Sequence, residues 1–528
     1  MPAAVESECT PLLPSESDPN HESQPNNSSI AGTPYSQTKR LVILAVCYGL
    51  LIILGIGGTL CSTPIIDIQE AIICRRFHGP DVDHDDPACK DKDVQGELSF
   101  IRGWHVSLTL LTSLIASVPY GAMADRYGRT IVLGLSFLGA TLTECFGALV
   151  CAMPHIFHPR AIWAGSLFQL VGGGEAILSA MVYTILADIS SEAQRATAFF
   201  YLGASLMGGA LIANPLVFLA MKRGPWFSIS IGLSCLAAST VIAFLTPETL
   251  SYRQQHAPSH TENNNAAASS PVEADTTAAA LKPNPLLQRA SAALSQTLHS
   301  VRFLFWEHKL VGFLLLSLGL EIFGRSVVLQ LMQYASRRFH MSYSEAGLLA
   351  SVIAFTSLLL LLVVLPGTSQ LLLSRLGFSA RQKDLRLAQA SAALAALGVI
   401  LQGVARDKVV LVAGIVVAGM GGGYTFMVRG LMTALVDGRE TGLLYTSIAF
   451  IEALSALVSG PVYAGLFHLG LEWGDEWVGL PFLFAGCVLV TAAVLVGVVS
   501  SAMVGKGTAV EEETDEADDV VGSGRLLR

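Results

Sequence analysis

The chain has 528 residues, of which 52% are apolar and 14% are charged, and its mean hydropathy is +0.55. The low charged fraction and the high hydropathy exclude an ordinary soluble protein and predict an integral membrane protein. The net charge of −9 is concentrated in tails and loops, and it gives no support to nucleic-acid binding.

The N-terminal segment 1–38 is polar and rich in Ser, Pro and Asn, which predicts a disordered cytoplasmic tail. No short apolar region with a cleavage site follows Met1, so we expect the first span to act as an uncleaved anchor. Within this tail, Glu8, Leu12 and Leu13 fit the acidic dileucine pattern E-x-x-x-L-L. Such a signal predicts sorting toward a vacuole or lysosome.

Twelve apolar stretches follow this tail, and about 20 apolar residues suffice to cross a hydrocarbon core about 30 Å thick. They centre on 41–63, 104–124, 131–153, 161–188, 196–219, 226–246, 310–332, 345–365, 386–405, 409–431, 442–469 and 477–503. We therefore expect an N-terminal six-helix half over 39–248 and a C-terminal six-helix half over 309–504.

The cytoplasmic segment 249–308 joins these halves and begins with a linker rich in Ser, Thr, Asn and Ala. Over 287–305 apolar residues recur at helical spacing, which predicts an amphipathic helix on the membrane surface, with a solvated helix as the alternative. The chain ends in an acidic tail over 505–528. Lys and Arg in the short loops place both termini in the cytoplasm.

The loop after the first span contains Cys74 and Cys89 in a polar, acidic setting on the outer side. No apolar context explains either cysteine, so we expect a local disulfide, with Cys61 as a competing partner. The His and Asp residues between them lack the spacing of metal ligands, and no metal site is predicted. Asp67 and Glu70, which precede the loop at i,i+3, are interpreted as a solvated helix end.

A charged turn separates the second and third spans. It reads Gly121-Ala-Met-Ala-Asp125-Arg126-Tyr-Gly128-Arg129, and it is short enough to force two antiparallel helices side by side. This G-x-x-x-D-R-x-G-R pattern resembles the loop signature of the major facilitator superfamily. The resemblance implies an all-α membrane protein with twelve transmembrane helices in two pseudo-symmetric six-helix halves.

Further segments, at 72–104, 187–196 and 246–250, are similar to a fungal branch of this superfamily that is distantly similar to the proton-coupled folate transporter group. A second copy of the turn, at 374–377, has lost its aspartate, so we expect the first copy to be the more important gate. The resemblance implies that a cytoplasmic gate is held closed by Gly121, Asp125, Arg126, Gly128, Arg129, Asp188 and Arg195.

Charged and polar side chains within the spans are candidates for binding protons or substrate, because charge is costly in a membrane. They are Glu452, Glu175, Glu321, Arg325, Arg429 and Tyr334. Glu452 either takes up and releases a proton or makes a structural hydrogen bond. Glu321 and Arg325, spaced i,i+4, either pair with each other or line the substrate path with Tyr334. Arg429 binds an anionic substrate, pairs with an acid or extends to the headgroups.

Two other acids lie in the N-terminal half. Glu175 follows three glycines and either lines a cavity or makes a buried hydrogen bond, whereas Glu144 is a weaker candidate because the third span is peripheral. Ser166 stands where the drug–proton antiporter pattern has an arginine, so proton antiport is a hypothesis here.

The preferred function is proton-linked export of a small organic solute, such as a fungal secondary metabolite or a toxic compound, by alternating access. Proton-coupled uptake of an organic nutrient or anion is the alternative, and a non-transporting solute receptor is a third hypothesis. No nucleophile–base set points to an enzyme, and no cofactor is expected. We expect a monomer that binds solute, protons and lipid, in the plasma or vacuolar membrane.

Overall fold

The computed structural model describes residues 37–83, 86–190, 192–248, 306, 309–375, 380–436 and 441–501. Across these ranges, twelve helical segments are long and apolar enough to cross a membrane. The predicted twelve-span, all-α membrane fold is confirmed. The predicted sorting signal at Glu8, Leu12 and Leu13, the helix over 287–305 and the acidic tail lie outside the described residues.

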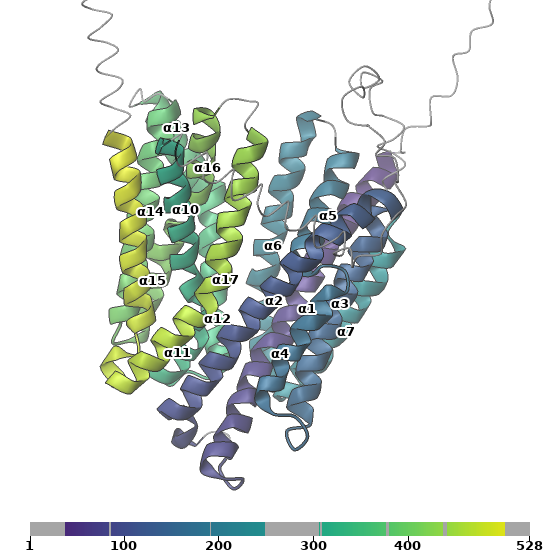
Figure 1. Cartoon of the computed structure of the whole chain (residues 1–528), viewed down its shortest axis with the longest axis vertical. Coiled ribbons are helices and arrows are strands. Elements are labelled where there is room, and N and C mark those ends of the chain that lie inside the picture. Colours follow the sequence, from purple (N-terminus) through teal and green to yellow (C-terminus); the bar gives the residue numbers. More distant parts are fainter. Residues whose placement is uncertain are drawn as a thin grey trace, which may run out of the picture.

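The first six segments form one bundle, the N-half, and the last six form a second, the C-half (Figure 1). The N-half consists of α1 (Gln37–His78), α2 (Lys92–Tyr127), α3 (Arg129–Ala152), α4 (Ile162–Gly165) with α5 (Gly174–Ile189), α6 (Glu192–Met221) and α7 (Pro225–Leu245). The C-half consists of α10 (Lys309–Arg325) with α11 (Leu331–Phe339), α12 (Tyr343–Leu359) with α13 (Leu365–Ser374), α14 (Ala380–Val404), α15 (Lys408–Met420) with α16 (Tyr424–Leu435), α17 (Thr441–Trp473) and a last helix over 480–501.

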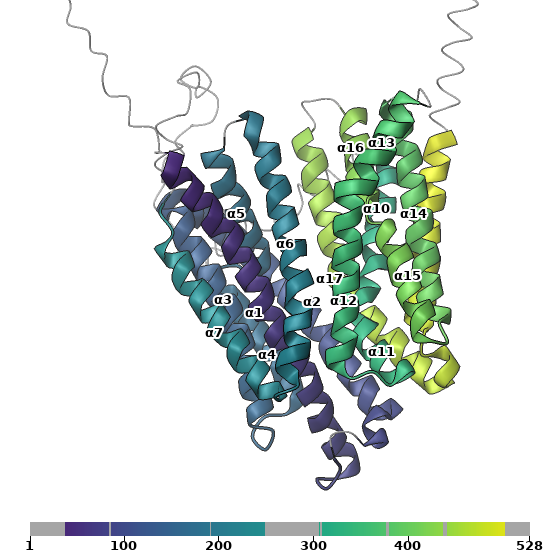
Figure 2. The same ribbon diagram turned by 180° about the vertical axis from the view of Figure 1, so that it is seen from behind.

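The described chain begins and ends on one side of the molecule, which we name the terminal face, and the opposite side is the distal face (Figure 1). The ribbons of the two halves diverge toward the terminal face, at the top of both views (Figures 1 and 2). Each half has its own apolar core, one around Phe137 and Val182 and another around Tyr334 and Phe482.

Two helices extend further at the distal face than the hydropathy pattern predicts. α1 continues to His78 and α2 begins at Lys92, because apolar residues beyond the predicted spans, including Ile73 and Val94, are buried in a distal apolar cluster. These extensions bring the polar ends of both helices to the boundary between the halves.

The fourth span of each half is interrupted at three consecutive glycines, Gly172–Gly174 and Gly421–Gly423. Gly172 has a φ of +88°, and a Cβ at this position would collide with the α3 backbone. Ser113 donates a 2.8 Å hydrogen bond to the carbonyl of Gly173, so neighbouring helices satisfy the backbone that the break leaves free.

The halves touch through their distal parts. α2 crosses α17 where a Cβ on Gly103 would lie 2.6 Å from the carbonyl oxygen of Gly460, so glycine permits this close approach. Nearby, the Ser107 hydroxyl donates to the carbonyl of Leu457 at 2.6 Å, and the Ser99 hydroxyl donates to the side-chain oxygen Oε1 of Gln330 at 3.2 Å.

Candidate functional site

At the terminal face, residues of the charged turn and its partners form a polar cluster, which we name the brace; its members are Arg129, Thr130, Asp188 and Glu248. The Arg129 guanidinium pairs with the Asp188 carboxylate and donates to the carbonyl of Thr184 at 3.3 Å, which joins α3 to α5. Arg129 is only 1% exposed, so this pair is removed from solvent. Both residues come from the gate that the sequence predicts, and the structure brings them together inside the N-half.

Glu248, just beyond α7, completes this brace. Its carboxylate accepts from the backbone N–H of Arg129 at 3.1 Å, from that of Thr130 at 3.2 Å and from the Thr130 hydroxyl at 2.7 Å. A negative charge at the N-terminus of α3 is favourable, because the first N–H groups of a helix lack partners. From the sequence, Glu248 was noted only as part of the segment 246–250 that resembles the family. Its contact with the charged turn was not predicted, because that contact depends on how α7 packs against α3.

The remaining gate residues differ in their surroundings. Gly128 has a φ of +114°, and a Cβ there would collide with the Glu248 carboxylate, so this glycine is required. A Cβ on Gly121 would meet open space, so no close approach requires glycine there. Arg126 is exposed and its guanidinium lies 5.4 Å from the centre of the Tyr127 ring. The side chains of Asp125 and Arg195 lie outside what the structure describes.

Replacing Glu248 with Ala is expected to lower the free energy of unfolding by about 1–2 kcal/mol, since α3 loses a charged cap. Glu248→Gln keeps one of the two oxygen acceptors and is expected to lose less. Thermal unfolding in detergent, followed by circular dichroism, measures both changes. Equal unfolding temperatures for wild type and Glu248→Ala would contradict this role.

In the C-half, the candidate charges form two ion pairs. Glu321 lies 3.5 Å from Arg325 one helical turn along α10, and Arg429 of α16 pairs with Glu452 of α17. Thr425 donates to Glu321 at 3.3 Å, and Glu321 also interacts electrostatically with the second pair. Four of the predicted residues thus form one polar cluster across α10, α16 and α17.

The other two candidates lie apart from this cluster. Tyr334 is fully buried in the C-half core and donates to the carbonyl of Gln402 at 2.7 Å, which differs from the expectation that it lines a path with Arg325. The reason is rotation of α11, which directs the ring toward Phe339 and Phe482. Glu175 lies in the first turn of α5, and its side chain is exposed.

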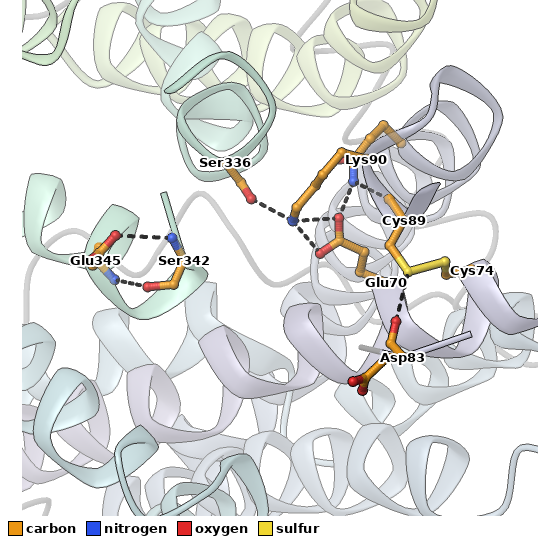
Figure 3. Close-up of polar contacts among 9 residues, drawn as sticks. Glu70, Cys74, Asp83, Cys89, Lys90, Ser336, Ser342 and Glu345 are labelled. Carbon is orange, nitrogen blue, oxygen red and sulfur yellow. Dashed lines mark hydrogen bonds and ion pairs between the residues drawn. A yellow bond between two sulfur atoms is a disulfide. The ribbon is translucent and has the colours of Figure 1, made fainter. Parts of the chain in front are cut away.

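A second polar cluster joins the halves at the distal face; we name its members Glu70, Lys90, Gln95, Ser336 and Tyr343 the distal seal. The Lys90 ammonium donates to both oxygens of Glu70 at 2.8 and 2.7 Å and to the Ser336 hydroxyl of the C-half at 2.7 Å (Figure 3). It also lies 4.8 Å from the centre of the Tyr343 ring, and Gln95 donates to Glu70. One cation of the N-half therefore contacts two residues of the C-half.

The interpretation of Asp67 and Glu70 as a solvated helix end is wrong. Glu70 is 2% exposed and Asp67 is 9% exposed. Both are covered because α1 and α2 extend together beyond the predicted spans and α1 packs against α12.

A disulfide joins Cys74 of α1 to Cys89, the residue before Lys90 (Figure 3). The expected polar setting is incorrect, because both cysteines are buried in the distal apolar cluster with Ile73 and Val94. Gln95 donates to the carbonyl of Cys89 at 3.1 Å. The disulfide and this hydrogen bond hold the backbone that carries Lys90.

Replacing both cysteines with alanine is expected to destabilise the protein by about 3 kcal/mol, the loop-closure value for a sequence separation of 15. Unfolding temperatures of wild type and Cys74→Ala/Cys89→Ala, each with and without reductant, test this. Reductant should lower the wild-type temperature and leave that of the double variant unchanged. A wild-type temperature that does not respond to full reduction would contradict the prediction.

Two six-helix halves that meet at one face and diverge at the other define a multi-pass membrane transporter. The chain belongs to the Major Facilitator Superfamily, whose sequence profile matches residues 99–460. It is 29% identical to the MFS efflux pump atnC of Emericella nidulans over 92% of this chain and 91% of that protein. It is also 28% identical to the MFS-type transporter aprT of Aspergillus flavus, over 93% and 94% of the two chains. Among solved structures, the nucleoside transporter NupG has a TM-score of 0.57 at 14% identity, covering 86% of this chain and 99% of that one.

Proposed function

We propose that this transporter exports a small organic solute, a secondary metabolite or toxic compound, from the cytoplasm in exchange for protons. The main support is similarity along more than nine-tenths of both chains to atnC, whose name describes an efflux pump. A second similar protein, ustT of Aspergillus flavus, is also named an efflux pump and is 27% identical over 82% of this chain.

The proposal takes the terminal face as cytoplasmic, in accord with the Lys and Arg of its short loops. In this orientation, the structure is the state that receives solute from the cytoplasm, with the distal seal closed toward the outside. The Arg129–Asp188 pair and Glu248 keep the ends of α3, α5 and α7 together as the halves move. The C-half pairs Glu321–Arg325 and Arg429–Glu452 are the charged groups that a solute or proton would meet in that half.

Transport assays in yeast cells that lack their main endogenous efflux pumps test this function. Cells are loaded with a panel of fluorescent organic compounds, including rhodamine 6G and tetracycline, and retention is followed with and without the protein. We expect faster loss of at least one compound, and we expect a protonophore to abolish the difference. Increased retention would indicate uptake instead, and export that ignores the protonophore would exclude the proton link.

A further inference from the structure

Gln333 lies in α11, the helix that carries Ser336 of the distal seal. Its neighbours three positions away on either side both contact the N-half. Gln330 accepts a hydrogen bond from the Ser99 hydroxyl of α2 at 3.2 Å. Ser336 accepts one from the Lys90 ammonium at 2.7 Å (Figure 3). Because residues three apart in a helix are neighbours on its surface, Gln333 lies on the side of α11 that faces the N-half, between these two contacts.

The opposite side of α11 belongs to the core of the C-half. With 3.6 residues per turn, the core residues of this helix all lie on the side away from Gln333. They are Leu331, Tyr334, Ala335 and Phe339. The Gln333 side chain is nevertheless 0% exposed, so it is fully covered while the halves meet at the distal face.

The amide of Gln333 makes no hydrogen bond to the part of the chain that the structure describes. No group there donates to its Oε1 or accepts from its Nε2. Water does not replace these partners, because it does not reach a side chain that is 0% exposed. An amide can donate two hydrogen bonds and accept two, and a buried amide that makes none retains the full penalty of its desolvation. Gln330, which is 2% exposed, is buried to nearly the same degree but is paired with Ser99.

We propose that the unpaired amide of Gln333 destabilises the closed distal face and so favours opening toward the outside, an inference that rests on the proposed alternating-access transport. When the halves separate at this face, the side of α11 that faces the N-half is uncovered and water hydrates the amide. The open state therefore has hydrogen bonds that the closed state lacks. Gln333 opposes the distal seal, in which the hydrogen bonds of Lys90 favour closure.

This opposition suits a protein that must open and close in every transport cycle. If all contacts at the distal face favoured closure, the open state would be rarely populated and solute would seldom leave. One unfavourable group among favourable ones brings the two states closer in free energy. A smaller difference in the affinity of solute or proton for the two states is then enough to interconvert them.

Two glutamines of the same segment provide a matched test. Gln333→Met and Gln330→Met make the same change three positions apart, and Met keeps the length of the side chain without its amide. Gln333→Met removes a group that has no partner, so the ratio of open to closed molecules should fall by about five- to hundredfold. Gln330→Met leaves the buried Ser99 hydroxyl without its acceptor, so the ratio should rise by about two- to tenfold.

Two measurements follow these changes, and neither needs a substrate. Spin labels are attached through p-acetylphenylalanine in place of Asp93 and Glu472, exposed residues at the distal ends of α2 and α17. Pulsed electron paramagnetic resonance in lipid nanodiscs then gives the ratio of open to closed molecules. Thermal unfolding in detergent is the second measurement. If most molecules are open, Gln333→Met changes the ratio; if most are closed, it raises the unfolding temperature, because the unfolded chain also hydrates the amide.

A ratio and an unfolding temperature that both equal those of wild type in Gln333→Met overturn the proposal. A change in the same direction as in Gln330→Met also overturns it, because Gln333 would then stabilise the closed face. Export from yeast is judged separately. Export by the wild type supports the transport function whatever Gln333→Met does, and expected shifts without export would contradict the transport function alone.

Discussion

Asp188→Asn is expected to lower the free energy of unfolding by about 3–5 kcal/mol. The substitution takes the Asp188 carboxylate away from Arg129, which is 1% exposed, and removing one partner of a buried ion pair is among the costliest defects in a folded protein. Chemical denaturation in detergent, followed by circular dichroism, measures this loss. The brace at the terminal face should therefore be a main source of stability in the N-half.

A double-mutant cycle separates loss of the pair from loss of packing. Arg129→Met/Asp188→Leu should be more stable than Asp188→Asn, because both charges of the buried pair are replaced together by apolar side chains. The control is Arg160→Met, which removes an exposed pair with Glu97 and should cost less than about 1 kcal/mol. Similar losses in Asp188→Asn and Arg160→Met would show that the brace contributes no more than a surface ion pair.

Lys90→Met is expected to open the distal face. The change removes the donor that joins Glu70 to Ser336 and leaves Glu70 buried without a cation in the closed state. A hydrogen bond to a charged group contributes about 1.5–3 kcal/mol, so the ratio of open to closed molecules should rise roughly ten- to hundredfold. Spin labels are attached at Asp93 and Glu472, exposed residues at the distal ends of α2 and α17, and pulsed electron paramagnetic resonance in lipid nanodiscs gives the distance between them, which measures that ratio.

Lys92→Met is the matched control for this prediction. Lys92 is an exposed lysine two positions after Lys90. Its replacement should therefore leave the distribution of label distances as in wild type. Ser336→Val, which removes the acceptor in the C-half and leaves the Lys90–Glu70 pair in place, should open the distal face less than Lys90→Met does. An unchanged distribution of label distances in Lys90→Met would show that Lys90 does not keep the distal face closed.

Features that depend only on local sequence could be predicted without the structure. The twelve spans follow from runs of apolar residues, because membrane insertion depends on the composition of each run. The i,i+4 spacing of Glu321 and Arg325 anticipated their contact, since helical geometry alone places such residues on one face. The spacing of Cys74 and Cys89 likewise limited the bridge to a short loop, although their burial was not foreseen.

Contacts between segments that are far apart in the sequence could not be predicted from local patterns. Glu248 reaches the turn across 118 positions, and Lys90 reaches Ser336 across 246. Glu144 looked peripheral because its span is peripheral, yet it lines a cavity formed by four helices. A hydropathy pattern specifies that a helix crosses the membrane but leaves its rotation and depth free.

The sequence by itself therefore determined the class of protein, the number of spans and the position of the charged turn. The tertiary structure alone decided which charges are paired and at which face the halves meet. The physical reason is that hydrophobic insertion depends on composition, whereas ion pairs and hydrogen bonds act over a few ångströms and require the packed arrangement of helices.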